Sequence, residues 1–253
     1  NNQIINNMII GGIQGLKRHI VSFSGGKDST AMLFKMIENN MKIDDVLFCD
    51  TGVEFPDMYD HIKQVEKYIG NKLTVIKNEY SYEYYMFDYI KVKGKNKGKR
   101  GYSWSDFRNR WCTRCLKLTP ISKYLRQYKG YDIIEYHGIA LDEIHRTEKN
   151  KGRDINYPLV EWGMTEKDCL EYCYSKGFTW NGLYEKFDRV SCFLCPLQRL
   201  RELKVIYREF PDLWAYMREL DRRSVEQFNR KFRSDYSIAE LEVKFDKEDM
   251  TIV

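Results

Sequence analysis

The sequence has few prolines and no long apolar segment. Only 5 of its 253 residues are proline, and no apolar run approaches the roughly 18 residues that a membrane-spanning helix needs. The first residues, NNQIINNMIIGGIQG, lack the positively charged segment and the continuous apolar segment of a secretory signal peptide. These absences lead us to expect a cytoplasmic protein with no membrane partner.

The chain also lacks a strong charge bias. Its 42 basic and 37 acidic residues give a net charge of +5, which favours an anionic partner only mildly. Its 7 cysteines are an odd number, and with a reducing compartment they argue against a disulfide framework. The 19 tyrosines suit either an aromatic core or a surface that stacks bases, and composition leaves both open.

Short β-rich segments alternate with helical patterns in the first part of the chain. Met58, Ile62, Val65 and Ile69 recur at helical spacing, and Gly70 is positioned to end that helix. This alternation predicts an α/β fold with a Rossmann-like parallel sheet flanked by helices, followed by a helical, cysteine-bearing C-terminal region. The expected strands are 19–24, 44–50, 72–77 and 131–140, and a helix is expected at 30–39.

Ligands bind beyond the carboxyl ends of the strands in such sheets. This rule brings three loops to one rim: Ser24–Ser29, Asp50–Glu54 and Gly138–Glu143. We therefore expect a single site that is built from three separate parts of the chain.

Two domains are expected. Residues 1–160 form the nucleotide-binding α/β domain, which contains a basic loop at 91–111 without apolar periodicity. Residues 161–253 form a helical region that carries the second cysteine pair. Thr165 and Asp168 match the capping box of its first long helix.

The segment SGGKDS connects the first expected strand to the first expected helix. Its glycines let backbone N–H groups approach an anion at the positive end of the helix. The lysine adds a mobile charge, the serines offer hydroxyl groups, and the aspartate can hold Mg²⁺ or cap the helix. A plain turn explains the glycines but not the other residues, so we predict phosphate binding. The residues are Ser24, Gly25, Gly26, Lys27, Asp28 and Ser29, with Lys27 and Asp28 as catalytic candidates.

SGGKDS resembles the PP-loop of the ATP pyrophosphatase superfamily, and it differs from the Walker loop because an acid follows the lysine. The resemblance implies an adenine nucleotide alpha hydrolase-like (HUP-type) fold, in which the loop holds pyrophosphate as ATP is cleaved between its α- and β-phosphates.

DTGVEFP closely resembles a segment of the family that joins PAPS (phosphoadenylylsulfate) reductases and ATP sulfurylase small subunits. Asp50, a third catalytic candidate, and Glu54 are suited to Mg²⁺ or the ribose, with turn chemistry and helix capping as the alternative. Thr51 and Gly52 complete this nucleotide-binding segment.

The segment GIALDEIHRTE resembles the family's G-x-R-x-x-E-x-x-R loop. Gly138, Glu143 and Arg146 match this pattern and are assigned to nucleotide binding. Ala140 stands where the first arginine is usual, so a sulfonucleotide bound in the usual way lacks one cation. We expect His145 to be an exposed loop residue.

RWCTRC and RVSCFLCP each contain a C-x₂-C pair. Two such pairs are typical of a metal centre, zinc or iron–sulfur, and four unrelated buried cysteines are the alternative. Neighbouring segments resemble cluster-bearing adenylylsulfate reductases, which have adjacent cysteines in the first pair, and this favours a 4Fe–4S cluster over Zn²⁺. The expected ligands are Cys112, Cys115, Cys192 and Cys195. Cys169 and Cys173 are expected in the core.

The basic loop combines positive charge with aromatic residues just before Cys112. Lysine and arginine attract a phosphate backbone, and aromatic rings stack bases. A solvated lysine loop is the alternative. The candidate nucleic-acid-binding residues are Lys95, Lys97, Lys99, Arg100, Trp104 and Arg108.

These patterns favour an ATP-dependent enzyme that adenylates a substrate, releases pyrophosphate and supports sulfur transfer, with tRNA or DNA as the acceptor and a protein as the sulfur donor. One alternative is a sulfonucleotide reductase or an ATP sulfurylase-like enzyme of sulfate assimilation. The intact Lys27 and the lack of a cysteine after Cys195 in this chain count against the reductase. The other alternative is a non-catalytic nucleotide- and nucleic-acid-binding subunit of a modification or defence complex.

Overall fold

The computed structural model describes residues 15–150, 153–190 and 192–250, and the chain divides into two compact units. The first unit comprises Asn1–Cys49, Pro56–Ile76 and Pro120–Gly182, and the second comprises Asp50–Phe55, Lys77–Thr119 and Leu183–Val253. Each unit is therefore assembled from segments that are separated in sequence. The division into domains 1–160 and 161–253 stays a prediction, because the units are defined by contacts and not by independent folding.

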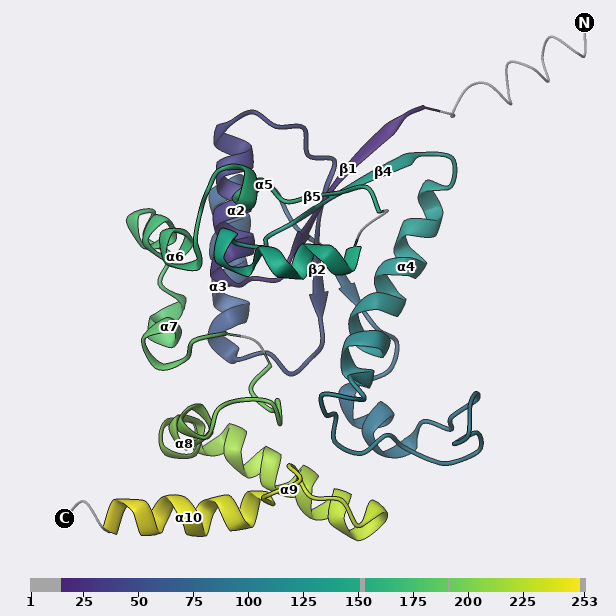
Figure 1. The fold of residues 1–253 in the computed structure, drawn as a ribbon, viewed down its shortest axis with the longest axis vertical. Helices are drawn as coiled ribbons and strands as arrows, with labels where there is room; N and C mark the ends of the chain where they lie inside the picture. The colour runs from purple at the N-terminus through teal and green to yellow at the C-terminus, as the bar shows by residue number, and fades with distance from the viewer. Residues whose placement is uncertain (1–14, 151–152, 191, 251–253) are drawn as a thin grey trace, which may run out of the picture. The chain divides into compact units, whose positions relative to one another are not determined.

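The first unit is built on a five-stranded sheet with the order β3-β2-β1-β4-β5 (Figure 1). β1 runs parallel to β2 and β4, and β4 runs parallel to β5, which confirms the expected α/β fold. The strand β5 was not expected, because its 2 residues are too short for a periodic pattern. The strands are β1 Lys17–Phe23, β2 Asp45–Asp50, β3 Thr74–Lys77, β4 Asp132–His137 and β5 Ile155–Asn156.

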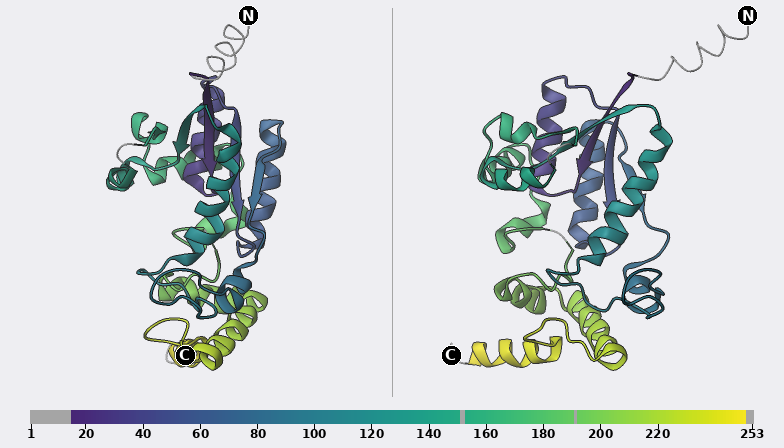
Figure 2. Two further views of the ribbon diagram at one scale, coloured as in Figure 1. Left: turned by 90° about the vertical axis from the view of Figure 1, so that its right-hand side faces the viewer. Right: turned by 45° about the vertical axis from the view of Figure 1, so that its right-hand side comes forward.

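Helices cover both faces of the sheet. They are α2 Lys27–Glu38, α3 Pro56–Ile69, α4 Thr119–Leu125, α5 Pro158–Glu161 and α6 Glu166–Ser175, with 3-10 turns at Arg126–Tyr128, Leu141–Asn150 and Trp180–Gly182. Ile20 and Leu47 pack with Ile121 of α4 on one face. Successive strand residues point to opposite faces, so Val21 and Phe23 are buried on the face that α2 and α3 cover (Figures 1 and 2).

Two predicted helix boundaries are confirmed. Gly70 follows α3 with a φ of +65°, the left-handed conformation expected of a residue that ends a helix. At the start of α6, the Asp168 N–H donates to Thr165 Oγ1 at 3.2 Å, and the Thr165 N–H donates to Asp168 Oδ2 at 2.8 Å. This capping box fixes the point at which α6 begins.

The second unit is mainly helical. Its elements are π-helical turns at Tyr84–Asp88 and Thr113–Leu118, and the helices α7 Leu183–Lys186, α8 Leu200–Glu209, α9 Pro211–Phe228 and α10 Ile238–Met250. The fully buried Trp104 donates its Nε1–H to Asp221 Oδ1 at 3.0 Å. The other oxygen of Asp221 accepts the Ile238 N–H at 2.7 Å, so one carboxylate on α9 joins the basic segment to α10.

None of the helices in the described part of the chain combines the length and the apolar character that a membrane crossing requires.

Gly138 follows β4 at a point where the chain passes directly over the start of α2. A Cβ atom at this position would lie 2.8 Å from both the Cα and the N of Ser29. Since backbone atoms cannot yield as a flexible side chain does, we expect Gly138→Ala to lower the free energy of unfolding by about 3 kcal/mol. Gly163→Ala is the control, because Gly163 has a φ of +68° and no atom within 4 Å. Its cost should be about 1 kcal/mol. Denaturant titrations measure both variants. Equal losses of unfolding free energy in the two would contradict the close approach of Gly138 to the Ser29 backbone.

Candidate functional site

The loop between β1 and α2 is shaped by the contacts of its first glycine. Gly25 has a φ of +79°, and a Cβ atom there would lie 2.4 Å from Met58 Sδ. The carbonyl oxygen of Gly25 accepts the Nε1–H of the buried Trp180 at 2.7 Å. The side chains of α3 and of the Trp180 turn therefore hold the loop in the position from which α2 begins.

The two serines of this loop are hydrogen-bonded to one another. Ser29 Oγ lies 3.0 Å from Ser24 Oγ and donates to the Gly26 carbonyl at 3.0 Å. Ser29 Oγ also accepts the Ser24 N–H at 3.2 Å. The loop is thus closed into a compact turn at the positive end of α2, the arrangement that binds anions at helix N-termini.

Lys27 is buried at the first position of α2, with an exposed fraction of 6%. Its Nζ lies 3.3 Å from Asp28 Oδ2 and 3.0 Å from Glu166 Oε2 at the start of α6. Burial disfavours the charged form of Lys27, but these carboxylates outweigh that effect and leave its pKa above the ordinary value. The ammonium group is therefore charged inside the site.

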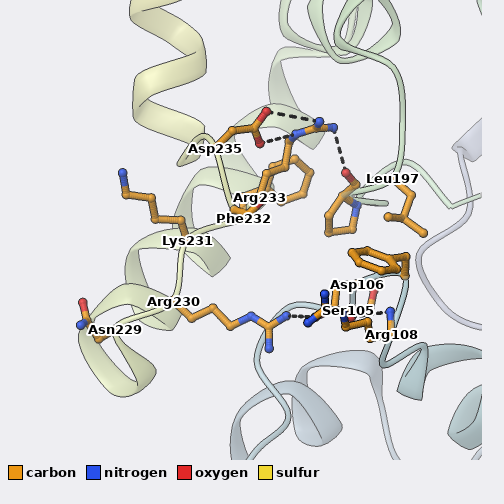
Figure 3. A pocket seen from close by; sticks show the side chains of 13 residues that line it. Ser105, Asp106, Arg108, Leu197, Asn229, Arg230, Lys231, Phe232, Arg233 and Asp235 are labelled. Atoms are coloured by element: carbon orange, nitrogen blue, oxygen red, sulfur yellow. Dashed lines mark hydrogen bonds and ion pairs between the residues drawn. The ribbon is translucent and has the colours of Figure 1, made fainter.

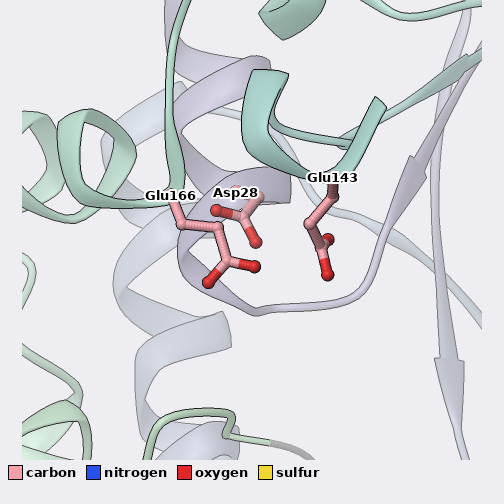
Figure 4. A group of neighbouring side chains, drawn as sticks. All are labelled: Asp28, Glu143 and Glu166. Atoms are coloured by element: carbon pink, nitrogen blue, oxygen red, sulfur yellow. The ribbon is translucent and has the colours of Figure 1, made fainter. Parts of the chain in front are cut away.

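Three carboxylates converge beside this lysine. Side-chain oxygens of Asp28, Glu143 and Glu166 all lie within 4.8 Å of one another, and Figure 4 shows them pointing toward a common centre. Burial raises the pKa of Asp28 to about 6, with Lys27 opposing the shift. Glu143 is buried and paired with Arg146. Carboxylate oxygens are the ligands that Mg²⁺ takes from proteins, so the donor set fits this ion.

The segment after β2 belongs to the second unit. Asp50 Oδ1 accepts the Gly52 N–H at 2.8 Å, and its Oδ2 lies 3.0 Å from Lys77 Nζ. Asp50, Thr51 and Gly52 line a cavity of about 240 Å³ together with Lys77 and the ring of Tyr82. These residues thus form a small polar cavity with both signs of charge.

Glu54 turns into the interior of the second unit. The Thr51 hydroxyl donates to Glu54 Oε1 at 2.8 Å, and Lys117 Nζ lies 3.9 Å from the same oxygen. Glu54 also forms an antiparallel β-bridge with Cys192. The DTGVEF segment therefore pairs directly with the second C-x₂-C segment.

All four predicted metal ligands lie in the second unit. The Cys192 and Cys195 thiols share a hydrogen bond, which lowers the pKa of Cys195 and raises that of Cys192. Arg110 and Lys117 also lower the pKa of Cys195, against the effect of burial. The buried hydroxyl of Tyr82 is close enough to Cys112, Cys192 and Cys195 for their charges to affect it, and Cys115 is similarly affected by Cys112. Cys112, Cys192 and Cys195 therefore lie in the neighbourhood of Tyr82.

Four residues near the predicted motifs lie either in the core or on the surface, without a role in the candidate site. Cys169 and Cys173 are fully buried, as predicted, and burial raises the pKa of both thiols. His145 is exposed, as predicted. Ala140 is fully buried, so its methyl group belongs to the packing of the first unit.

The basic segment forms an ordered hairpin. Ile90 and Arg100 are bridged, and the Gly98 N–H donates to the Lys91 carbonyl at 2.7 Å. The prediction that Trp104 stacks on bases is wrong, because its indole is fully buried against Phe232 and bonded to Asp221. The other predicted contact residues, Lys95, Lys97, Lys99, Arg100 and Arg108, are exposed.

Sequence reasoning missed Glu166 and the cations that surround the hairpin. Glu166 follows Thr165, and its only local signal was a place in the first turn of a capped helix. Arg230 lies far along the chain and joins the hairpin region through an ion pair with Asp106 at 2.5 Å. Neither residue belongs to a motif, so only the folded chain reveals them.

Comparisons with known proteins identify similar chains. A family model described as the phosphoadenosine phosphosulfate reductase domain matches residues 18–198. An uncharacterized protein of Methanocaldococcus jannaschii is 32% identical over 220 residues, which cover 83% of this chain and 42% of that protein. A second from the same organism is 31% identical over 204 residues, with 76% and 45% covered.

A more distant relative is an uncharacterized nin region protein of Escherichia phage lambda, 28% identical over 175 residues that cover 59% of this chain and 56% of that protein. The chain thus spans about half the length of the curated relatives it matches. Among solved structures, the PAPS reductase of Candida auris in a phosphate complex aligns with a TM-score of 0.45 and 17% identity. The alignment covers 72% of this chain and 83% of that one.

The raised pKa of Asp28 makes a prediction about stability. Its pKa rises from 3.8 to about 6 on folding, so the folded protein binds this proton more tightly than the unfolded chain. Ionisation of the buried Asp28 therefore lowers the free energy of unfolding. This loss is absent below the unfolded pKa of 3.8 and complete above the folded pKa of about 6. We expect Asp28→Asn to raise the melting temperature at about pH 8 and to leave it unchanged at about pH 3.

Thermal unfolding of the nucleotide-free protein at both pH values measures this effect. Asp60→Asn is the control, because the Asp60 side chain is 56% exposed and should shift neither melting temperature. An equal shift for Asp28→Asn at both pH values would show that burial does not govern its ionisation.

Proposed function

The chain belongs to the phosphoadenosine phosphosulfate reductase domain family, and we propose that it is an ATP-dependent enzyme of this family which adenylates its substrate and releases pyrophosphate. The observation that carries the proposal is the buried, charged Lys27 at the start of α2. A lysine in this position neutralises negative charge that develops on a leaving pyrophosphate, which lowers the barrier to cleavage between the α- and β-phosphates.

The Ser24–Ser29 loop supplies the remaining contacts to phosphate in this proposal. Backbone N–H groups of Gly25 and Gly26 and the hydroxyls of the two serines surround the positive end of α2. When phosphates bind, Lys27 moves from the carboxylates to the phosphate oxygens. Asp28, Glu143 and Glu166 are then the carboxylates that hold Mg²⁺, and Gly138 and Arg146 of the same unit are retained as candidate nucleotide contacts.

We assign Cys112, Cys115, Cys192 and Cys195 to a 4Fe–4S cluster, with Zn²⁺ as the alternative. The support for the cluster is the resemblance of the neighbouring segments to cluster-bearing adenylylsulfate reductases, and two C-x₂-C pairs suit either centre. The bound cluster would supply sulfur-transfer or electron-transfer chemistry. Arg110 and Lys117 stabilise the thiolate form of Cys195.

The acceptor that we favour is nucleic acid, tRNA or DNA, with a protein as the sulfur donor. The support is the basic hairpin, which precedes Cys112 directly and lies in the same compact unit as all four cysteines. The second candidate function is sulfonucleotide reduction, which the family match favours. Ala140, at the position of the usual arginine, and the lysine-bearing loop count against it.

Lys27→Gln should reduce pyrophosphate release by at least about 100-fold, because the charge that stabilises the departing group is lost. The assay contains ATP, Mg²⁺ and total tRNA or single-stranded DNA, and it follows AMP and pyrophosphate together. Lys63→Gln is the control, since the Lys63 side chain on α3 is 74% exposed and should leave the rate unchanged. Formation of ADP and inorganic phosphate would contradict the proposed bond cleavage, and intact ATP despite tight binding would favour a non-catalytic subunit.

Cys112→Ser, Cys115→Ser, Cys192→Ser and Cys195→Ser should each lower the iron and sulfide bound by anaerobically purified protein, because each removes one cluster ligand. Cys169→Ala and Cys173→Ala are the matched controls and should retain the metal of the wild type. Visible spectra with iron, sulfide and zinc analysis measure the result. Colourless wild-type protein with stoichiometric zinc would show that the centre is Zn²⁺ and not a cluster. Loss of metal from the two control variants would contradict the assignment of the four ligands.

A further inference from the structure

The second unit contains a hollow of about 810 Å³ beside the basic hairpin. Six cationic side chains line it, and none of its lining residues in the described chain is an aspartate or glutamate. The hairpin and the segment that follows it provide five of the cations. Arg230, which lies just beyond the end of α9, provides the sixth. They are Lys91, Lys93, Lys95, Arg108, Arg114 and Arg230.

Aromatic rings form part of the wall of this hollow. Tyr89 and Tyr102 are stacked, with ring centroids 5.4 Å apart and planes 19° from parallel. Tyr102 is stacked in turn on the buried Trp111 at 5.6 Å. Lys91 Nζ lies 5.1 Å from the centre of the Tyr102 ring. The hollow thus combines positive charge with half-buried tyrosine rings that the core holds in position.

Lys91 lies close to other cations, and Arg230, a member of the same group, is ion-paired with Asp106. Burial lowers the pKa of Lys91, and repulsion from Lys99 and Arg230 adds to that effect. A bound polyanion would relieve this repulsion, since each phosphate replaces a like-charged neighbour with an opposite charge.

A second hollow of about 770 Å³ shares Arg108 and Arg230 with the first. Its wall includes Pro196 and Leu197, which follow Cys195 directly (Figure 3). Arg233 donates to the carbonyl oxygens of Pro196 and Gln198, both at 3.0 Å, and so fixes the loop that carries this cysteine. The two hollows therefore share two arginines, and the second reaches the segment that follows the second cysteine pair. The second hollow also contains Asp106 and Asp235, which are paired with Arg230 and Arg233.

We propose that these two hollows form one groove that binds a single strand of nucleic acid. Its phosphates contact the cations around Arg108 and Arg230, and its bases lie against Tyr89 and Tyr102. An unpaired strand is the form that fits, because duplex bases are already stacked and cannot reach tyrosine rings. The strand leads toward Cys195. The inference deepens the proposed function by locating its acceptor, but binding in the groove does not require ATP.

The groove differs from the binding surface that the sequence predicts, and this difference gives a matched test. Lys93, Lys95 and Arg108 line the groove and are exposed, so replacing them should not disturb folding. Lys97, Lys99 and Arg100 belong to the same segment and are exposed, but they do not line it. The triple variants Lys93→Gln/Lys95→Gln/Arg108→Gln and Lys97→Gln/Lys99→Gln/Arg100→Gln remove the same charge.

Fluorescence anisotropy with labelled oligonucleotides of 12 nucleotides, in RNA and in DNA form, measures binding over a range of salt concentrations. We expect the groove variant to bind at least about 10-fold more weakly than the wild type and its salt slope to fall by about 2, as loss of three phosphate contacts predicts for a single strand. The control variant should lose less than about 3-fold. The corresponding duplexes should bind more weakly than the single strands.

Equal weakening in the two variants, tighter binding of duplexes, or lack of binding to any oligonucleotide by the wild type would overturn the groove. ATP binding by the same proteins separates this failure from failure of the proposed function. Protein that binds ATP but no oligonucleotide rejects the groove alone. Protein that binds single strands through the groove but never binds ATP rejects the proposed enzyme and leaves the groove supported.

Discussion

A single buried ammonium group organises the candidate nucleotide site of the first unit. Moving a charge out of water costs several kcal/mol unless opposite charges accompany it, and the carboxylates of Asp28 and Glu166 provide these charges beside Lys27. Glu166 comes from α6, whose start is fixed by the Thr165 capping box. The ion pairs therefore hold the start of α6 against the start of α2, and they also form the cluster of carboxylates that suits Mg²⁺. The same lysine is the group best suited to phosphate, so nucleotide binding and the stability of this site are coupled.

Local sequence patterns predicted much of the first unit. Strands β1 to β4, the end of α3 at Gly70 and the capping box of α6 depend on residues that are near one another in the chain, and each is confirmed. The helix expected at 30–39 begins earlier, at Lys27, so the second half of the segment Ser24–Ser29 is the first turn of α2. Glu166 was not predicted, because its role comes from the packing of α6 on α2 and not from its neighbours in sequence. Trp104 was misassigned because its burial also depends on distant packing. The sequence of a basic, aromatic segment does not indicate whether its tryptophan is buried or exposed.

The second unit depends on contacts between distant segments. The β-bridge between Glu54 and Cys192 brings the DTGVEF segment to the second cysteine pair, and Asn78 donates to the Cys115 carbonyl at 2.8 Å beside the first pair. Sequence spacing indicates four thiolates but cannot indicate this pairing. It also cannot indicate that Arg230 lies beside the hairpin. Through these contacts, the cavity at Asp50, the cysteines and the basic groove become parts of one unit.

The most direct test of the account is equilibrium binding of Mg²⁺–ATP and of adenylyl sulfate to the wild-type protein, measured by titration calorimetry under anaerobic conditions. A loop with an intact lysine at the departing pyrophosphate should bind ATP clearly more tightly than adenylyl sulfate, which has no β- or γ-phosphate. Tight binding of adenylyl sulfate without binding of ATP would contradict the account and identify the site as that of a sulfonucleotide reductase.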